Sequence, residues 1–157
     1  ALSNYLTLLS PKDIGDIQIF AIKIDRLETL RARFEPSRID TILDSVTAAV
    51  TSRLDASQTV MAYTKDSELV IATSVTDLPD ISEMETRIAQ CIQDAVPEEK
   101  SLDSAWASVS IGAPVPVQGA KNQRAELAIR RALESAENRI LSKNGQTVIQ
   151  LPQASSN

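Results

Sequence analysis

The feature that most constrains the fold is the apolar run Ile17–Asp25, with the sequence IQIFAIKID. It is rich in β-branched residues and carries no charge before Lys23. A strand that faces solvent on one side alternates apolar and polar residues, whereas a strand buried on both faces is apolar almost throughout. The run therefore predicts a strand near the centre of a sheet that is covered on both faces.

The rest of the chain alternates helical and extended patterns, with one exception in the middle. Two short apolar runs, Thr59–Tyr63 and Leu69–Thr73, are separated by five polar residues, which predicts a hairpin. Ser37 and Ser82 are the expected N-caps of two helices, the second in a capping box with Glu85. Helices are expected at Arg26–Arg33, Ser37–Leu54, from Ser82 to before Pro97, and at Arg124–Ser142, and further strands at Ala105–Gly112 and Gln146–Leu151.

The resulting order of elements is β-α-α-β-β-α-β-α-β, which is not the strict alternation of a doubly wound parallel sheet. It is typical of an α/β (α+β) fold of the ferredoxin-like or palm type, with a mixed, mostly antiparallel five-stranded sheet and flanking helices. We expect one domain at residues 16–151, a linker or helix at 1–15 and a tail or linker at 152–157. Loops are expected at Pro11–Gly15 and Pro114–Lys121.

Composition removes several classes of function. The 157 residues include no His and a single Cys, which excludes serine–histidine and cysteine–histidine hydrolases and zinc sites. A net charge of −5 argues against a nucleic-acid partner. The sequence has no apolar stretch of membrane-spanning length and no signal peptide, so we expect a cytoplasmic domain without membrane contact. Because it begins without Met, we expect it to be part of a larger protein.

The remaining charged and unusual side chains have structural interpretations. Glu68 is expected to pair with Lys65 across the hairpin, and Cys91 to be a small core residue. Trp106 is expected either in the core or in contact with a neighbouring domain. The last helix is expected to present a solvated, salt-bridged face, because its cations alternate with acids: Arg124, Arg130, Arg131 and Arg139 with Glu126, Glu134 and Glu137.

Four segments resemble a known family, and they occur in the family's order. They are Ile22–Leu30 (IKIDRLETL), Tyr63–Ala72 (YTKDSELVIA), Ser108–Gly112 (SVSIG) and Ile129–Ile149. These are similar to the strand end, signature hairpin, S-I-G strand and closing helix of the GGDEF domain, the diguanylate cyclase module. The resemblance implies a palm-type fold. In an active member it also implies two metal ions, held by carboxylates, that clamp a nucleoside triphosphate.

The metal-binding positions depart from the family pattern. The first Asp of the family's D-x-D strand end falls at Lys23, and the second acid remains as Asp25. The signature itself falls on Lys65, Asp66, Ser67, Glu68 and Leu69. Side chains therefore replace both glycines, which obstructs close approach of a nucleotide, and the hydroxyl of Ser67 replaces the metal-binding acid. A one-residue slip in the alignment would place Asp66 there instead.

The nucleotide-binding positions are also mostly changed. The Asn that reads guanine in the family falls at Arg31, while the acid that assists it is kept as Asp40. An acid at that place, in the first turn of a helix, is also favoured by the helix dipole alone. The R-x-x-D motif of product inhibition is not matched before the hairpin. We therefore expect at most a vestige of nucleotide binding, at Asp40.

These departures from the family pattern lead us to expect a domain that is not an enzyme and has no catalytic residues, metal or cofactor. We expect a regulatory or interaction module in cyclic di-GMP signalling, a bacterial pathway with motility and biofilm as usual outputs. It would position or dimerise a neighbouring EAL-type or sensor domain of the same chain, and could form a homodimer. Two alternatives remain open: a non-catalytic sensor of GTP or another nucleotide, and an active diguanylate cyclase with unusual residues.

Overall fold

The central strand is the element around which the fold is built. The computed structural model describes residues 2–96 and 104–143. In it, β1 (Ile17–Ile24) pairs antiparallel with β3 (Leu69–Ser74) on one side, and with β4 (Val109–Ile111) and β5 (Val115–Pro116) on the other. The hairpin partner β2 (Thr59–Tyr63) completes the order β2-β3-β1-β4. The predicted mostly antiparallel, five-stranded sheet with helices on it is confirmed.

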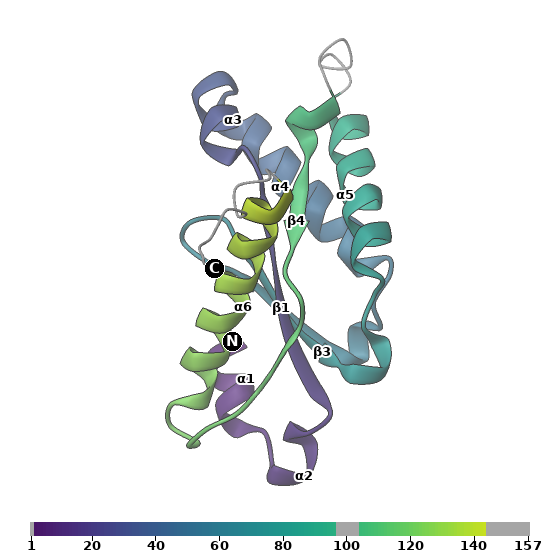
Figure 1. The fold of residues 1–157 in the computed structure, drawn as a ribbon. Helices are drawn as coiled ribbons and strands as arrows, with labels where there is room; N and C mark the ends of the chain where they lie inside the picture. Colours follow the sequence, from purple (N-terminus) through teal and green to yellow (C-terminus); the bar gives the residue numbers. More distant parts are fainter. Residues whose placement is uncertain (1, 97–103, 144–157) are drawn as a thin grey trace.

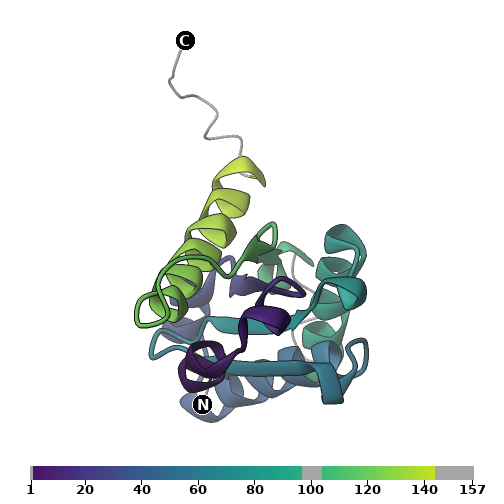
Figure 2. The ribbon, with the colours of Figure 1, turned by 90° about the horizontal axis from the view of Figure 1, so that it is seen from below.

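Both faces of β1 are covered, as its apolar run predicted. Phe20, Ile22 and Ile24 belong to a core beneath α3 (Leu27–Arg33), α4 (Pro36–Thr51) and α5 (Ile81–Ala95). Ile19 and Ala21, on the other face, belong to a second core with α1 (Leu2–Leu8) and α6 (Arg124–Lys143). Figure 1 shows α6 and α1 side by side along the sheet, and Figure 2, seen from below, shows the sheet between the two groups of helices.

The helix starts differ from the predicted ones. The N-cap of α4 is Glu35, with Pro36 in the first turn, rather than Ser37, because proline suits a position whose N–H has no helical acceptor. The N-cap of α5 is Asp80, whose side chain accepts a hydrogen bond from the Glu83 backbone N–H at 2.9 Å. The capping box of Ser82 is therefore wrong.

Some short elements also differ from the predictions. The segment predicted as a loop at Pro11–Gly15 contains a short helix, α2 (Pro11–Ile14), with Ser10 as its N-cap. The predicted strand at Ala105–Gly112 is divided into a 3₁₀ turn (Ser104–Ala107) and β4. Further 3₁₀ turns lie at Ala56–Gln58 and Val75–Asp77.

The fifth strand is not the one that the sequence predicts. β5 lies within the predicted loop Pro114–Lys121, where two residues pair with Gln18 and Ile19 of β1. A two-residue strand that contains a proline is too short to show an alternating pattern. It is recognised only by its pairing with β1. The predicted strand Gln146–Leu151 lies outside the described residues, and the domain limits of 16–151 stay a prediction.

The N-terminal helix is fastened to α6 by a buried arginine. Arg124 is 6 % exposed, and its guanidinium donates to the backbone carbonyls of Leu6 and Thr7 at 3.0 Å and to that of Leu9. A cation at the carboxyl end of a helix is favourable because the last carbonyls lack helical donors. The predicted solvated position of Arg124 is therefore wrong.

Trp106 is a core residue, one of the two roles expected of it. It is 7 % exposed and packs edge-on against Phe34, with ring centroids 6.0 Å apart. Cys91 is half-buried and packs against the same core. None of the helices that the structure describes has an apolar stretch long enough to span a bilayer.

Tyr63 fixes the end of β2 to α4 and gives a testable dependence on pH. Its hydroxyl donates to the Leu43 carbonyl at 2.7 Å and lies 3.0 Å from the Thr47 hydroxyl. Tyr63 keeps 37 % of its surface exposed, and the partial burial of its hydroxyl raises the pKa of Tyr63; the Thr47 hydrogen bond opposes this rise and the charge of Asp44 adds to it. The unfolded chain therefore loses this proton first, so the stabilisation is full below about pH 10 and declines as the pH rises through the folded pKa.

We expect Tyr63→Phe to lower the free energy of unfolding by about 0.5–1 kcal/mol at pH 7. The difference from the wild type should shrink as the pH rises beyond about 10. Urea denaturation at a series of pH values measures both effects, with Tyr5→Phe as the control. A difference that stays constant up to the highest pH would contradict this assignment.

Candidate functional site

A cleft of about 450 Å³ lies where the end of β1 meets the hairpin loop, the start of α3 and α6. Five of the sequence-predicted residues line it, namely Lys23, Asp25, Asp66, Ser67 and Glu68. Three others lie elsewhere: Leu69 is buried in the core, Lys65 is exposed, and Asp40 is exposed on α4. The fold thus gathers most of the signature positions, and Asp40 is not one of the residues that line the cleft.

Lys23 holds the centre of this cleft. Its ammonium nitrogen lies 3.0 Å from a carboxylate oxygen of Glu68 in the hairpin and 3.0 Å from one of Glu137 on α6. Burial alone would lower the pKa of Lys23, but the hydrogen bonds and charges of these two carboxylates outweigh it and raise that pKa. The ammonium is therefore charged at neutral pH. The predicted pair of Glu68 with Lys65 is wrong, because the carboxylate of Glu68 pairs with Lys23 while Lys65 is exposed to solvent.

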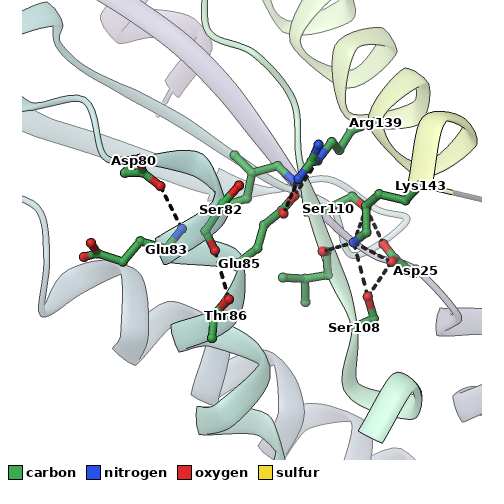
Figure 3. A network of polar contacts seen from close by, with 12 residues as sticks. Asp25, Asp80, Ser82, Glu83, Glu85, Thr86, Ser108, Ser110, Arg139 and Lys143 are labelled. Carbon is green, nitrogen blue, oxygen red and sulfur yellow. Dashed lines mark hydrogen bonds and ion pairs between the residues drawn. The ribbon is translucent and has the colours of Figure 1, made fainter.

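Asp25 is occupied by contacts that join β1 to β4 and α6. Its carboxylate accepts hydrogen bonds from the hydroxyls of Ser108 and Ser110, at 2.7 and 2.6 Å, and from the ammonium of Lys143 at 2.9 Å. Lys143 also donates to the Val109 carbonyl at 2.7 Å. Figure 3 shows these groups converging on one another at the end of α6. Asp25 therefore connects the end of the sheet to its closing helix.

The hairpin loop adopts a tight turn without any glycine. The backbone N–H of Thr64 donates to the Glu68 carbonyl at 2.8 Å, and that of Ser67 to the Thr64 carbonyl at 3.0 Å. Ser67 is left-handed, with φ of 63°, as expected for the last residue of a three-residue hairpin loop, a place that glycine usually takes. Arg31 of α3 donates to the Ser67 hydroxyl at 2.5 Å. This contact places a guanidinium beside the signature loop.

Glu85 and Arg139 form an ion pair at the outer edge of β4, in which the carboxylate is nearly buried and the arginine is partly exposed. The guanidinium donates to both carboxylate oxygens, at 3.0 and 2.7 Å, and the backbone N–H of Ile111 donates to one of them at 2.9 Å. In Figure 3 the two side chains meet between α5 and α6. Arg139 is salt-bridged and partly exposed, as predicted for this face of the helix, but its partner is Glu85 of α5 rather than an acid of its own helix.

Sequence reasoning missed the partners that decide the chemistry of the site. Glu137 and Lys143 belong to no recognisable motif, and the spacing of Glu85 from Ser82 predicts a capping box instead of an ion pair. Ser108 and Ser110 were the detectable signal, since two hydroxyls separated by one residue lie on the same face of a strand. Their shared acceptor, Asp25, is distant in sequence and needed the fold to identify it.

The residues of the cleft do not fit a divalent metal ion. Metal sites of this kind use clustered carboxylate oxygens. Here the ammonium of Lys23 stands between Glu68 and Glu137, and the Asp25 carboxylate already accepts three hydrogen bonds. Across residues 2–96 and 104–143, no group of three or more acidic or Cys side chains is arranged to hold a metal.

Comparisons with known proteins connect this geometry to a fold. No family model and no curated protein matches the sequence. The FimX GGDEF domain from Pseudomonas aeruginosa is similar in structure, with a TM-score of 0.56 and 16 % identity over 99 % of this chain and 87 % of that one. An EAL/GGDEF domain protein from M. capsulatus is also similar, with a TM-score of 0.54 and 15 % identity over 87 % of this chain and 85 % of that one. This chain therefore has the fold of a GGDEF domain, as the order of its motifs predicted.

Proposed function

We propose that this domain is a catalytically inactive GGDEF-like module that regulates or positions a neighbouring domain in cyclic di-GMP signalling. One observation carries the proposal: the ammonium of Lys23 lies between Glu68 and Glu137, where the resemblance implies a carboxylate and a metal. The ammonium of Lys23 forms an ion pair with Glu68, the acid that remains at its place in the signature. The domain then contributes a surface and a fold to its protein rather than chemistry.

Electrostatics explains why the cleft is unsuited to a metal-bound triphosphate. A divalent ion about 4 Å from an ammonium is repelled by roughly 2–8 kcal/mol, for effective dielectric constants between those of water and a protein surface. The lining of the cleft also includes five carboxylates against two cations, Lys23 and Arg26. A triphosphate would bring further negative charge to this lining, so its binding is disfavoured with or without the metal.

A nucleotide sensor is the second candidate, and the size of the cleft favours it although the charge of its lining does not. Its volume of about 450 Å³ is within the range of small-molecule sites. The guanidinium of Arg31 lies against Ser67 of the lining, where it offers a cation to a phosphate. Such a sensor would bind a nucleotide without turnover.

Assay and calorimetry on the same purified chain test the proposal. We expect no cyclic di-GMP from GTP with Mg²⁺ or Mn²⁺, with an active diguanylate cyclase assayed in parallel. We also expect no heat of binding with GTP, GTP plus Mg²⁺, or cyclic di-GMP. Binding of a nucleotide without product would favour the sensor. Product that disappears in Glu68→Gln would replace the proposal with an active cyclase of unusual residues.

The partner is proposed to be a neighbouring domain of EAL or sensor type in the same protein. The similar structure described as an EAL/GGDEF domain protein supports this context. The net charge of −5 supports a protein partner rather than a nucleic acid. We further propose that the domain lies in the cytoplasm, with motility or biofilm formation as the output of the pathway.

We also propose that the module itself can dimerise. Size-exclusion chromatography with light scattering tests this part of the proposal.

A further inference from the structure

The Lys23 ammonium joins three segments that are far apart in the sequence. Lys23 lies on β1, Glu68 at the base of the hairpin loop and Glu137 on α6. The side chain of Lys23 is 17 % exposed and that of Glu68 is 18 % exposed. The ion pair of Lys23 with Glu68 is therefore shielded from solvent more than an ordinary surface pair, and it is correspondingly stronger. The Glu137 side chain is 50 % exposed, so its contact with Lys23 is the weaker of the two.

Glu68 links this ion pair to the shape of the loop. One of its carboxylate oxygens meets Lys23, and the other accepts a hydrogen bond from the Thr64 hydroxyl at 2.9 Å. The Thr64 hydroxyl oxygen in turn lies 3.2 Å from the backbone N–H groups of Asp66 and Glu68, which donate to it. The position of the ammonium is thus transmitted to the backbone of the hairpin loop.

Removing the ammonium would turn attraction into repulsion. The two carboxylate oxygens each lie 3.0 Å from the same nitrogen, so they are at most twice that distance apart. Without a cation between them, two like charges would face each other across the cleft. The hairpin loop and α6 would then be driven apart.

We infer that Lys23 is an internal latch that holds the hairpin loop, residues 64–68, against α6 and fixes the two walls of the cleft in place. The inference rests on the proposed function, because the cation that holds these walls is the one that stands where the resemblance implies a metal. The latch is built into the chain and needs no ligand.

Hydrogen exchange followed by mass spectrometry on the full chain tests the latch. In Lys23→Met, we expect amides of residues 64–69 and 136–140 to exchange about tenfold faster than in the wild type. Lys65→Met is the matched control, because Lys65 is exposed in the same loop, and its exchange should equal that of the wild type. Equal exchange in Lys23→Met and Lys65→Met would overturn the latch.

A neutral variant separates electrostatic latching from loss of packing. In Lys23→Met with Glu68→Gln and Glu137→Gln, the repulsion is gone, so exchange should return toward the wild-type rate. If this variant exchanges at least as fast as Lys23→Met, the side chain acts by packing and the latch is wrong. Should Lys23→Met fail to fold, Glu137→Gln alone provides the test: faster exchange confined to the loop and α6 supports the latch, and unchanged exchange refutes it.

The cyclase assay on the same samples keeps the two proposals apart. Product from the wild type would end the proposed function, while the exchange pattern would still decide the latch. No product together with identical exchange in Lys23→Met and Lys65→Met would end the latch alone.

Discussion

Gly112→Ala is expected to lower the free energy of unfolding by about 3 kcal/mol or more. A Cβ at this position would lie 2.4 Å from the backbone nitrogen of Ala136 and 2.6 Å from the carbonyl carbon of Ser135. Both atoms belong to the backbone of α6, so no side-chain rotation can relieve the overlap. The helix would have to move away from β4 and from the core that its alanines share with β1.

Gly15→Ala is the matched control for this prediction. A Cβ at Gly15 would meet nothing within 4 Å, and its backbone is already right-handed helical, with φ of −70° and ψ of −18°. We expect it to be neutral or to stabilise by up to about 1 kcal/mol. Urea denaturation of the two variants measures the difference. If Gly112→Ala unfolds within about 0.5 kcal/mol of the wild type, the contact between β4 and α6 is not as close as described.

Arg139→Met is expected to have the second largest effect, a loss of about 2–3 kcal/mol. Removing one partner of a fully buried ion pair costs about 3–5 kcal/mol, because the other charge stays buried. Here the Glu85 side chain is 10 % exposed, but that of Arg139 is 35 % exposed. In the variant, water can therefore reach the Glu85 carboxylate where the guanidinium was, so the loss of stability is smaller than for a fully buried pair.

Two variants make the prediction for Arg139 specific. Adding Glu85→Gln to Arg139→Met removes the buried charge but keeps an oxygen for the Ile111 N–H, so we expect the double variant to recover about 1 kcal/mol. Arg131→Met changes an exposed arginine of the same helix and should stay within about 0.5 kcal/mol of the wild type. A double variant less stable than Arg139→Met would show that the buried carboxylate is not the source of the loss.

The S-I-G strand has a structural role at each of its three residues. Ser110 donates to Asp25, Ile111 offers its backbone N–H to Glu85, and Gly112 lets α6 approach. Only the Ser110 contact reaches a signature position, Asp25; the contacts of Ile111 and Gly112 are with α5 and α6. The motif can therefore persist in a module without catalysis, because the fold itself requires it.

The arrangement of the central elements followed from local sequence. The apolar run of β1 predicted a strand covered on both faces, and two apolar runs around five polar residues predicted the β2–β3 hairpin. The apolar stripe of α6 likewise predicted its extent closely. The spacing of apolar residues along a segment indicates whether one face or both faces of that segment are buried. These features could therefore be inferred without knowledge of the fold.

The partner of each charged side chain was decided by the tertiary structure alone. Local spacing favoured Glu68 with Lys65 and Arg139 with acids of its own helix, whereas the fold pairs Glu68 with Lys23 and Arg139 with Glu85. Lys23 and Glu137 are separated by 114 positions in the chain. A long charged side chain can reach several neighbours, and which carboxylate it meets depends on where the strand end, hairpin and closing helix come together. The sequence by itself thus determined a central strand covered on both faces and the hairpin beside it. Only the tertiary structure decided the fifth strand and the pairing of Lys23 with Glu68 and Glu137, because both depend on which distant segments meet β1.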